Sequence, residues 1–231
     1  MSTILAVHQP NYLPWVGYFH KIAQVDVFVF LDSVQYPRGR SVANRNRIKT
    51  AQGVQWLTVP VSLPKGAHGK ATYRDVILRD DRWKKTHLKT LRVNYGRAPH
   101  FHPHFDRIEE ILLQPRPFVE MNVALIRYFL SQLGVDTPLY HLSELPEVTG
   151  RKSELIINIC RHFGADVYLS GQGARKYNDE ALFAANDIRL AYQEFTCPPY
   201  PQLFGEFVPD LSIVDLLFNC GPESGAILLG G

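Results

Sequence analysis

The sequence is poor in the features that stabilise secreted proteins or anchor membrane proteins. Its three cysteines, Cys160, Cys197 and Cys220, are widely spaced, odd in number and free of any CxxC pair. This usage argues against a disulfide framework and a zinc site, and it favours a reducing compartment. No stretch approaches the roughly 20 apolar residues that cross a bilayer, and the start, MSTILAVHQPNY, lacks a basic leader. We therefore expect a cytoplasmic protein without a membrane span or a bound metal.

Acidic residues are absent from one long segment. Between residues 33 and 74 there is no Asp or Glu, although the segment carries eight basic residues: Arg38, Arg40, Arg45, Arg47, Lys49, Lys65, Lys70 and Arg74. Such asymmetry indicates an anionic partner, and Arg interleaved with Asn46 suits phosphate. Because the whole chain has a formal net charge of +3, the remainder carries −5. We therefore expect a phosphorylated small molecule and no nucleic acid, although a simple solvated basic face remains an alternative.

Hydrophobic and aromatic residues are abundant enough, at 45% and 12%, to exclude disorder. Residues 3–8 and 26–31 are typical of buried strands, and residues 15–24 between them are typical of a helix, which makes a βαβ unit. Residues 32–53 are expected to be a polar loop. Helical spacing recurs over residues 82–95, 105–113 and 118–133. We predict one α/β domain over residues 1–231, with a parallel sheet of Rossmann-like type and a helical insertion over about residues 80–135.

The turn after the first predicted strand carries four polar side chains: His8, Gln9, Asn11 and Tyr12. Ligands of open α/β sheets bind beyond the carboxyl ends of strands and beside helix N-termini, which is where this turn lies. We predict His8 and Asn11 as catalytic residues, and Gln9 and Tyr12 as substrate contacts. Gly17, inside the following helix, indicates close packing at that point. The alternative is that the polar residues only hydrogen-bond the turn and that the neighbouring aromatic residues are core.

A second glycine-containing turn, SGQGARKY, follows the strand predicted over residues 166–169. Two glycines separated by one residue let the backbone present N–H groups to an anion. The spacing matches neither the dinucleotide fingerprint nor a Walker loop. The predicted substrate- or phosphate-binding residues of this turn are Ser170, Gly171, Gln172, Arg175 and Tyr177. The alternative is an ordinary turn from a strand to a helix.

Three further groups of residues are less informative. The segment HFHPH at residues 100–104 has metal-compatible alternation, but it reads as a loop, and a surface or capping role is the more common one. Asp215 is a possible acid that could equally pair within the core. Cys220 could act as a nucleophile if an exposed base activated it.

Several of these motifs resemble the WbqC-like family. HQPNYLPWVGYFHKI, RNRIK followed by WLTVPV, YLSGQGARKY and the terminal LSIVDLLFNCGPE are all similar to that family's pattern. The resemblance covers nearly the whole chain. It implies a role near bacterial O-antigen, other surface-polysaccharide or specialised-metabolite biosynthesis, without implying a settled reaction.

A second resemblance is to the nucleotidyltransferase superfamily with HIGH-type motifs. The segment Trp15–Tyr18 keeps the glycine of H-x-G-H and has aromatic residues in place of both histidines, while Ser170 to Arg175 has a spacing similar to the superfamily's second motif. This resemblance implies a nucleotide-shaped pocket and leaves adenylyl transfer by the usual histidines in doubt.

Together these observations favour an enzyme, specifically a transferase that moves an acyl or aminoacyl group to the amine of a nucleotide-linked sugar or a similar acceptor. In this hypothesis His8 is the general base. Arg38, Arg45, Arg47 and Arg175 hold phosphate, while Asn11, Asn46 and Gln172 orient the acceptor. The alternatives are a nucleotidyltransferase or ATP-dependent ligase, and a non-catalytic scaffold of glycan assembly. The sequence identifies no cofactor and leaves oligomerisation open.

Overall fold

The computed structural model describes residues 2–37, 41–67 and 69–230. Arg38, a predicted phosphate-binding residue, lies outside them. The chain forms two compact units. Unit 1 comprises Met1–Gln9, His20–Ser33 and Asp136–Thr196, and unit 2 comprises Pro10–Phe19, Val34–Val135 and Cys197–Gly231. The single-domain organisation stays a prediction. Among the described residues, no helix is both long and apolar enough to cross a membrane.

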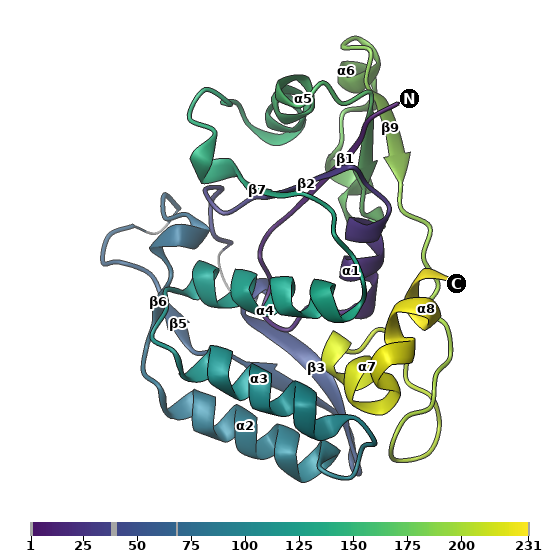
Figure 1. The fold of residues 1–231 in the computed structure, drawn as a ribbon. Coiled ribbons are helices and arrows are strands. Elements are labelled where there is room, and N and C mark those ends of the chain that lie inside the picture. The colour runs from purple at the N-terminus through teal and green to yellow at the C-terminus, as the bar shows by residue number, and fades with distance from the viewer. Residues whose placement is uncertain (1, 38–40, 68, 231) are drawn as a thin grey trace. The chain divides into compact units, whose positions relative to one another are not determined.

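Unit 1 is built on a five-stranded sheet in the order β7-β2-β1-β8-β9, with every neighbouring pair parallel (Figure 1). The strands are β1 (Ile4–His8), β2 (Val27–Phe30), β7 (Leu139–His141), β8 (Val167–Ser170) and β9 (Arg189–Tyr192). This confirms the predicted Rossmann-like parallel sheet. The chain adds β2 and β7 on one side of β1 and then β8 and β9 on the other. Such a reversal beside β1 is where doubly wound sheets bind their ligands.

Three helices accompany these strands: α1 (Val16–Ala23), α5 (Lys152–His162) and α6 (Glu180–Ala184). The boundary between the units falls within α1, after Phe19. The central strands β1, β2 and β8 are buried and mainly apolar, because both faces of a parallel sheet are covered. Between β8 and α6, for example, the Tyr168 and Phe183 rings stack with their centroids 5.4 Å apart.

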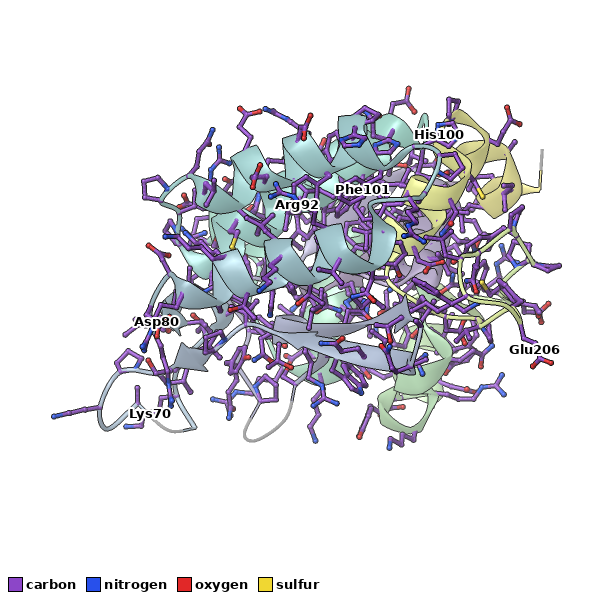
Figure 2. The ribbon with its side chains drawn as sticks, turned by 90° about the horizontal axis from the view of Figure 1, so that it is seen from below. Lys70, Asp80, Arg92, His100, Phe101 and Glu206 are labelled. Atoms are coloured by element: carbon purple, nitrogen blue, oxygen red, sulfur yellow. The ribbon has the colours of Figure 1, made fainter. Side chains whose placement is uncertain are left out.

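Unit 2 contains the predicted helical insertion, formed by α2 (Arg82–Tyr95), α3 (Phe101–Leu113) and α4 (Phe118–Gln132). In Figure 1, α3 lies between α2 and α4. The Arg92 guanidinium lies 4.8 Å from the centroid of the Phe105 ring, which joins α2 to α3. Figure 2 labels Arg92 together with Phe101, the first residue of α3, whose ring stacks on Phe105 with a centroid distance of 4.7 Å.

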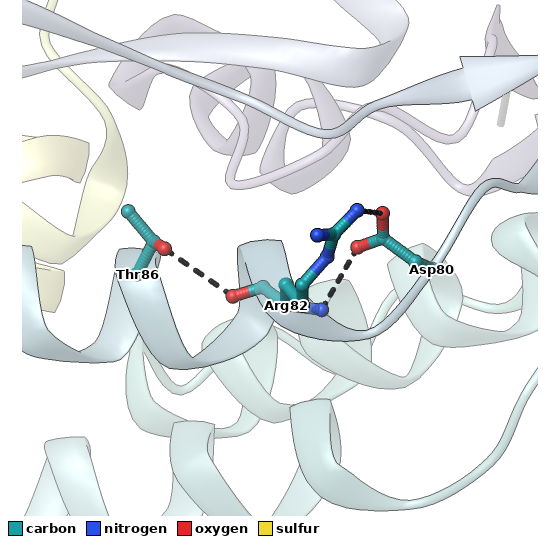
Figure 3. A network of polar contacts seen from close by, with 3 residues as sticks. All are labelled: Asp80, Arg82 and Thr86. Carbon is teal, nitrogen blue, oxygen red and sulfur yellow. Dashed lines mark hydrogen bonds and ion pairs between the residues drawn. The ribbon is translucent and has the colours of Figure 1, made fainter.

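Polar contacts define where α2 begins (Figure 3). The Asp80 carboxylate accepts hydrogen bonds from the backbone N–H of Arg82, at 2.9 Å, and from its guanidinium, at 3.0 Å. One turn later the Thr86 hydroxyl donates to the Arg82 carbonyl at 3.2 Å. A carboxylate just before a helix satisfies an N–H group that has no partner within the helix and complements the positive end of the dipole.

Two local predictions in unit 2 are wrong. Residues 45–50, expected to be loop, form β3 (Arg45–Thr50), which pairs antiparallel with β4 (Gly53–Thr58) around a turn where Gly53 has a φ of 107°. Residues 101–104 of HFHPH, also expected to be loop, open α3. Pro103 is tolerated there because the first helical turn has no intrahelical use for its missing N–H.

The rest of unit 2 is short and irregular. β5 (Val61–Ser62) pairs with β6 (Ile77–Leu78). The C-terminal helices are α7 (Ile213–Cys220) and α8 (Ser224–Leu229). Buried helix α7 carries Asp215.

Candidate functional site

The carboxyl edge of the sheet in unit 1 aligns two histidines. His8 ends β1 opposite Phe30, and Phe30 is opposite His141, the last residue of β7. Residues in register on parallel strands place their Cβ atoms on the same face, so the two imidazoles belong to one face of the sheet and flank Phe30. The Phe30 and His141 ring centroids are 5.3 Å apart. This edge is the position predicted for the site.

His141 is held by a buried carboxylate. Asp32, fully buried just beyond β2, lies 3.1 Å from Nδ1 of His141 through Oδ2. A carboxylate accepts and does not donate, so Nδ1 carries the proton and Nε2 has the lone pair. The described residues provide no hydrogen bond to Nε2, and the His141 side chain is 16% exposed. This is the arrangement in which a carboxylate fixes the tautomer and orientation of a general base.

Ser143 also donates to Asp32. Its backbone N–H donates to Oδ1 at 2.9 Å, and its hydroxyl donates to Oδ2 at 2.7 Å. Because the hydroxyl points to the carboxylate and not to His141, the three residues do not form a nucleophilic triad. Sequence reasoning missed Asp32, His141 and Ser143. The available signal was a polar residue at the end of one strand or just beyond the end of its neighbour, in LYHLS and FLD.

His8 is a weak base in this structure. Its Nδ1 lies 3.2 Å from the Gln9 carbonyl oxygen, which again places the proton on Nδ1. Burial, and then the nearby charge of Lys21, lower the pKa of His8 to about 3. The imidazole is therefore neutral at pH 7 and takes up a proton poorly. This favours His141 over His8 as the base, while the predicted catalytic role of His8 stays untested.

The glycine-containing turn uses much of its polarity to hold itself in place. After β8, residues 172–177 form a short 3-10 helix. Ser170 is buried and its hydroxyl accepts from the Asn178 amide at 3.0 Å, while the Gln172 amide donates to the Gln193 carbonyl at 3.0 Å. A Cβ added at Gly171 would meet nothing within 4 Å, so this glycine leaves open space beside the turn. Tyr177 is 67% exposed.

Arg175 is the residue of this turn with access to a cavity. Its guanidinium lies 4.5 Å from the centroid of the Tyr192 ring on β9. Beside it is a cavity of about 650 Å³, which is lined by Arg175, Glu180, Ala184, Asp187, Ile188, Arg189, Leu190 and Tyr192. Two guanidinium groups and two carboxylates line this cavity together with apolar side chains. Arg175 therefore stays a candidate for ligand contact.

Five of the predicted residues belong to unit 2: Asn11, Tyr12, Arg45, Asn46 and Arg47. Most of them have structural partners there. Tyr12 is fully buried, with its hydroxyl 3.0 Å from Nδ1 of His87. The Asn46 amide donates to the Leu13 carbonyl at 2.6 Å, and the Arg47 guanidinium donates to the Asp210 carbonyl at 3.1 Å.

The remaining two residues of that set are less constrained. The Arg45 guanidinium stacks 3.7 Å from the centroid of the Trp56 ring, which is 43% exposed. Asn11 is 6% exposed, and its Oδ1 has no hydrogen-bond partner among the described residues. The other seven predicted residues, His8, Gln9, Ser170, Gly171, Gln172, Arg175 and Tyr177, lie in unit 1.

Aromatic residues that follow the turn after β1 belong to the core, as one alternative in the sequence analysis expected. Tyr18 and Phe19 are buried. The Trp15 ring packs over Gly17, where a Cβ would stand only 2.2 Å from a ring carbon. The close packing expected at this glycine is confirmed. The Trp15 ring therefore packs against the first turn of α1, within unit 2.

Asp215 and Cys220 have features of buried structural groups. The carboxylate of Asp215 accepts from the hydroxyls of Tyr95, at 2.6 Å, and Tyr200, at 3.0 Å. Burial raises the pKa of the Cys220 thiol to about 11, which disfavours the nucleophilic thiolate at neutral pH. Among the described residues, no group of three or more His, Cys, Asp or Glu side chains could hold a metal ion.

The chain is similar to known proteins over almost its full length. The model of the WbqC-like protein family matches residues 9–227. An uncharacterised protein of Mycobacterium tuberculosis (strain ATCC 25618 / H37Rv), Rv1507c, is 39% identical over 223 residues, which cover 95% of each chain. No solved structure matches. These similarities confirm the resemblance to the WbqC-like family, while the resemblance to the nucleotidyltransferase superfamily stays a prediction.

Proposed function

The chain belongs to the WbqC-like family, and we propose that unit 1 transfers an acyl or aminoacyl group to an amine on a phosphorylated acceptor, such as a nucleotide-linked sugar. The observation that supports this proposal best is the Asp32–His141 pair at the carboxyl edge of the sheet. The family resemblance favours a place in bacterial surface-polysaccharide or specialised-metabolite biosynthesis.

The reaction follows from the tautomer of His141. Its Nε2 accepts a proton from the acceptor amine as the amine nitrogen forms a bond to the acyl carbon of an activated donor. Asp32 stabilises the imidazolium that results, because it already holds Nδ1–H. The imidazolium then returns the proton to the leaving group as the bond between that group and the acyl carbon breaks. General-base catalysis of this kind contributes roughly 10²–10⁴-fold to the rate.

The test begins with a thermal-shift screen of the purified protein against nucleotide sugars, acyl-CoA, amino acids and ATP with magnesium. A ligand present at 100 times its dissociation constant stabilises the fold by about 2.7 kcal/mol. Turnover with the ligands found is then measured for His141→Gln and Asp32→Asn. We expect both variants to lose at least about 10²-fold in kcat.

A matched control is available in the same unit. His162 on α5 also faces a carboxylate through Nδ1, 3.1 Å from Glu147, and it is 33% exposed. His162→Gln should keep full activity. Full turnover by His141→Gln would refute the assigned base, and no shift with any ligand would instead favour a scaffold of glycan assembly.

The order of the sheet favours a second candidate, a nucleotidyltransferase or an ATP-dependent ligase. The strand order with a reversal beside β1 is the one in which doubly wound folds bind nucleotides. Pyrophosphate release that requires ATP with magnesium would identify this chemistry. A thermal shift with nucleotide sugar or acyl-CoA, and none with ATP, would exclude it.

A further inference from the structure

Among the described residues three lysines are buried, and they differ in how their charge is compensated. Lys84 is 4% exposed and pairs with the Asp81 carboxylate at 2.8 Å. Lys49 is 3% exposed and donates to three oxygen atoms, those of the Gln202 side chain and of the Gly205 and Glu206 carbonyls. Each of these ammonium groups has either a counterion or a full set of acceptors.

Lys21 has neither. It is 3% exposed, and its Nζ donates to a single acceptor, the Val7 carbonyl, at 3.0 Å. Among the described residues, no carboxylate forms an ion pair with it. An ammonium group has three donors, and burying it without a counterion costs several kcal/mol. Within the part of the chain that the structure describes, two donors and the positive charge of Lys21 are therefore uncompensated.

The position of Lys21 indicates a role for its uncompensated amine in ligand binding. Its acceptor belongs to the residue before His8, so the amine reaches β1 at its carboxyl end. This is the strand beside which the order of the sheet reverses, the usual position of ligand in such folds. The positive charge of Lys21 also acts on His8, which is only partly buried at the same edge.

We propose that Lys21 is the cation of an oxyanion-binding subsite at the carboxyl end of β1, and that the subsite takes a phosphate group of the substrate. The proposal rests on the proposed function for the identity of the substrate and names the group that the sheet edge holds. The oxyanion supplies the counterion and the two missing acceptors.

The competing explanation is that Lys21 is a neutral amine that serves only to bond the Val7 carbonyl. Burial lowers its pKa to about 7, so about half of the molecules carry a neutral amine at that pH. Five other titratable groups stand on α1, at the end of β1 and on either side of β2: His8, Tyr18, His20, Asp26 and Asp32. Burial lowers the pKa of both histidines, and Asp32 bonds His141 and Ser143.

The experiment is calorimetric titration of the full-length protein with inorganic phosphate and with sulfate, in buffers of different ionisation enthalpy. Sulfate is a dianion at pH 7, so any proton taken up when sulfate binds goes to the protein. At pH 7 we expect saturable binding with uptake of about half a proton, because the anion selects the ammonium form of a group whose pKa is about 7. Lys21→Met should weaken binding at least tenfold and abolish the uptake.

The control is Lys152→Met, which removes the same charge from an exposed position of unit 1 and should leave binding unchanged. Absence of saturable binding, or binding without proton uptake, would overturn the proposal. Proton uptake is measured on the parent protein, so this test remains valid even if Lys21→Met fails to fold. The titration measures binding without turnover. The subsite therefore fails if the anion does not bind, whatever His141→Gln does to activity, and the proposed reaction fails if His141→Gln keeps full turnover, whether or not the anion binds.

Discussion

Replacing Lys21 by Met should remove a pH dependence of stability that the fold creates. The pKa of Lys21 is lowered from 10.5 to about 7 by burial. Between these two values the unfolded chain holds a proton that the folded chain has lost, so the free energy of unfolding rises with pH. With one pKa unit worth about 1.4 kcal/mol, the Lys21 contribution should rise by about 2 kcal/mol between pH 7 and pH 9. Met has a similar shape and does not titrate.

The assay is urea denaturation of both proteins at pH 7, 8 and 9 in phosphate-free buffer. It should be followed by far-ultraviolet circular dichroism, because all three tryptophans lie in unit 2. The quantity to compare is the difference in the free energy of unfolding between Lys21→Met and the parent, because the contributions of the other titrating groups cancel in it. His8, with a pKa of about 3, stays neutral throughout. The lost bond to the Val7 carbonyl adds a constant of about 1 kcal/mol.

We expect the free energy of unfolding of Lys21→Met, relative to that of the parent, to be highest at pH 7 and to fall progressively towards pH 9. Lys152→Met, at an exposed position, should track the parent at every pH. A difference between Lys21→Met and the parent that stays constant over this range would refute the reasoning, because it would mean that the folded protein keeps Lys21 fully charged.

Three further predictions concern packing, the buried carboxylate and the cysteine. Gly17→Ala should destabilise unit 2 by about 1–3 kcal/mol, because its Cβ would stand 2.2 Å from the Trp15 ring; Gly173→Ala, with nothing within 4 Å, is the control, and equal midpoints in urea would contradict the packing argument. Asp32→Ala should cost about 1–3 kcal/mol, because it leaves the donors of His141 and Ser143 without their acceptor; unchanged thermal unfolding would contradict this. Cys220 should react with a thiol reagent at neutral pH much more slowly than a free thiol, because its pKa is raised to about 11. Fast labelling of Cys220, identified by mass spectrometry against Cys220→Ser, would show that the thiol is exposed and ionised.

Local pattern was sufficient for the elements that are long or strongly apolar. The runs that became β1 and β2 could be identified because a strand buried on both faces is continuously apolar. Helix α2 could be identified to its end residues because its apolar positions recur at helical spacing over Arg82–Tyr95. The hairpin of β3 and β4 was missed because RNRIKT is polar and gives little period-2 signal, while its pairing with GVQWLT depends on a turn at Gly53.

Residue patterns were enough to predict a parallel α/β sheet with a helical insertion and to place His8 at the end of its first strand. Which side chains meet at that edge depends on the tertiary fold. Asp32 and His141 are 109 positions apart, and register between β2 and β7 brings them together. Lys21 is one of several lysines in the sequence. It differs from the other buried lysines, Lys49 and Lys84, because the described residues give it neither a carboxylate partner nor a full set of acceptors. The physical reason is that strand register and desolvation depend on contacts between distant segments, which local residue patterns do not encode.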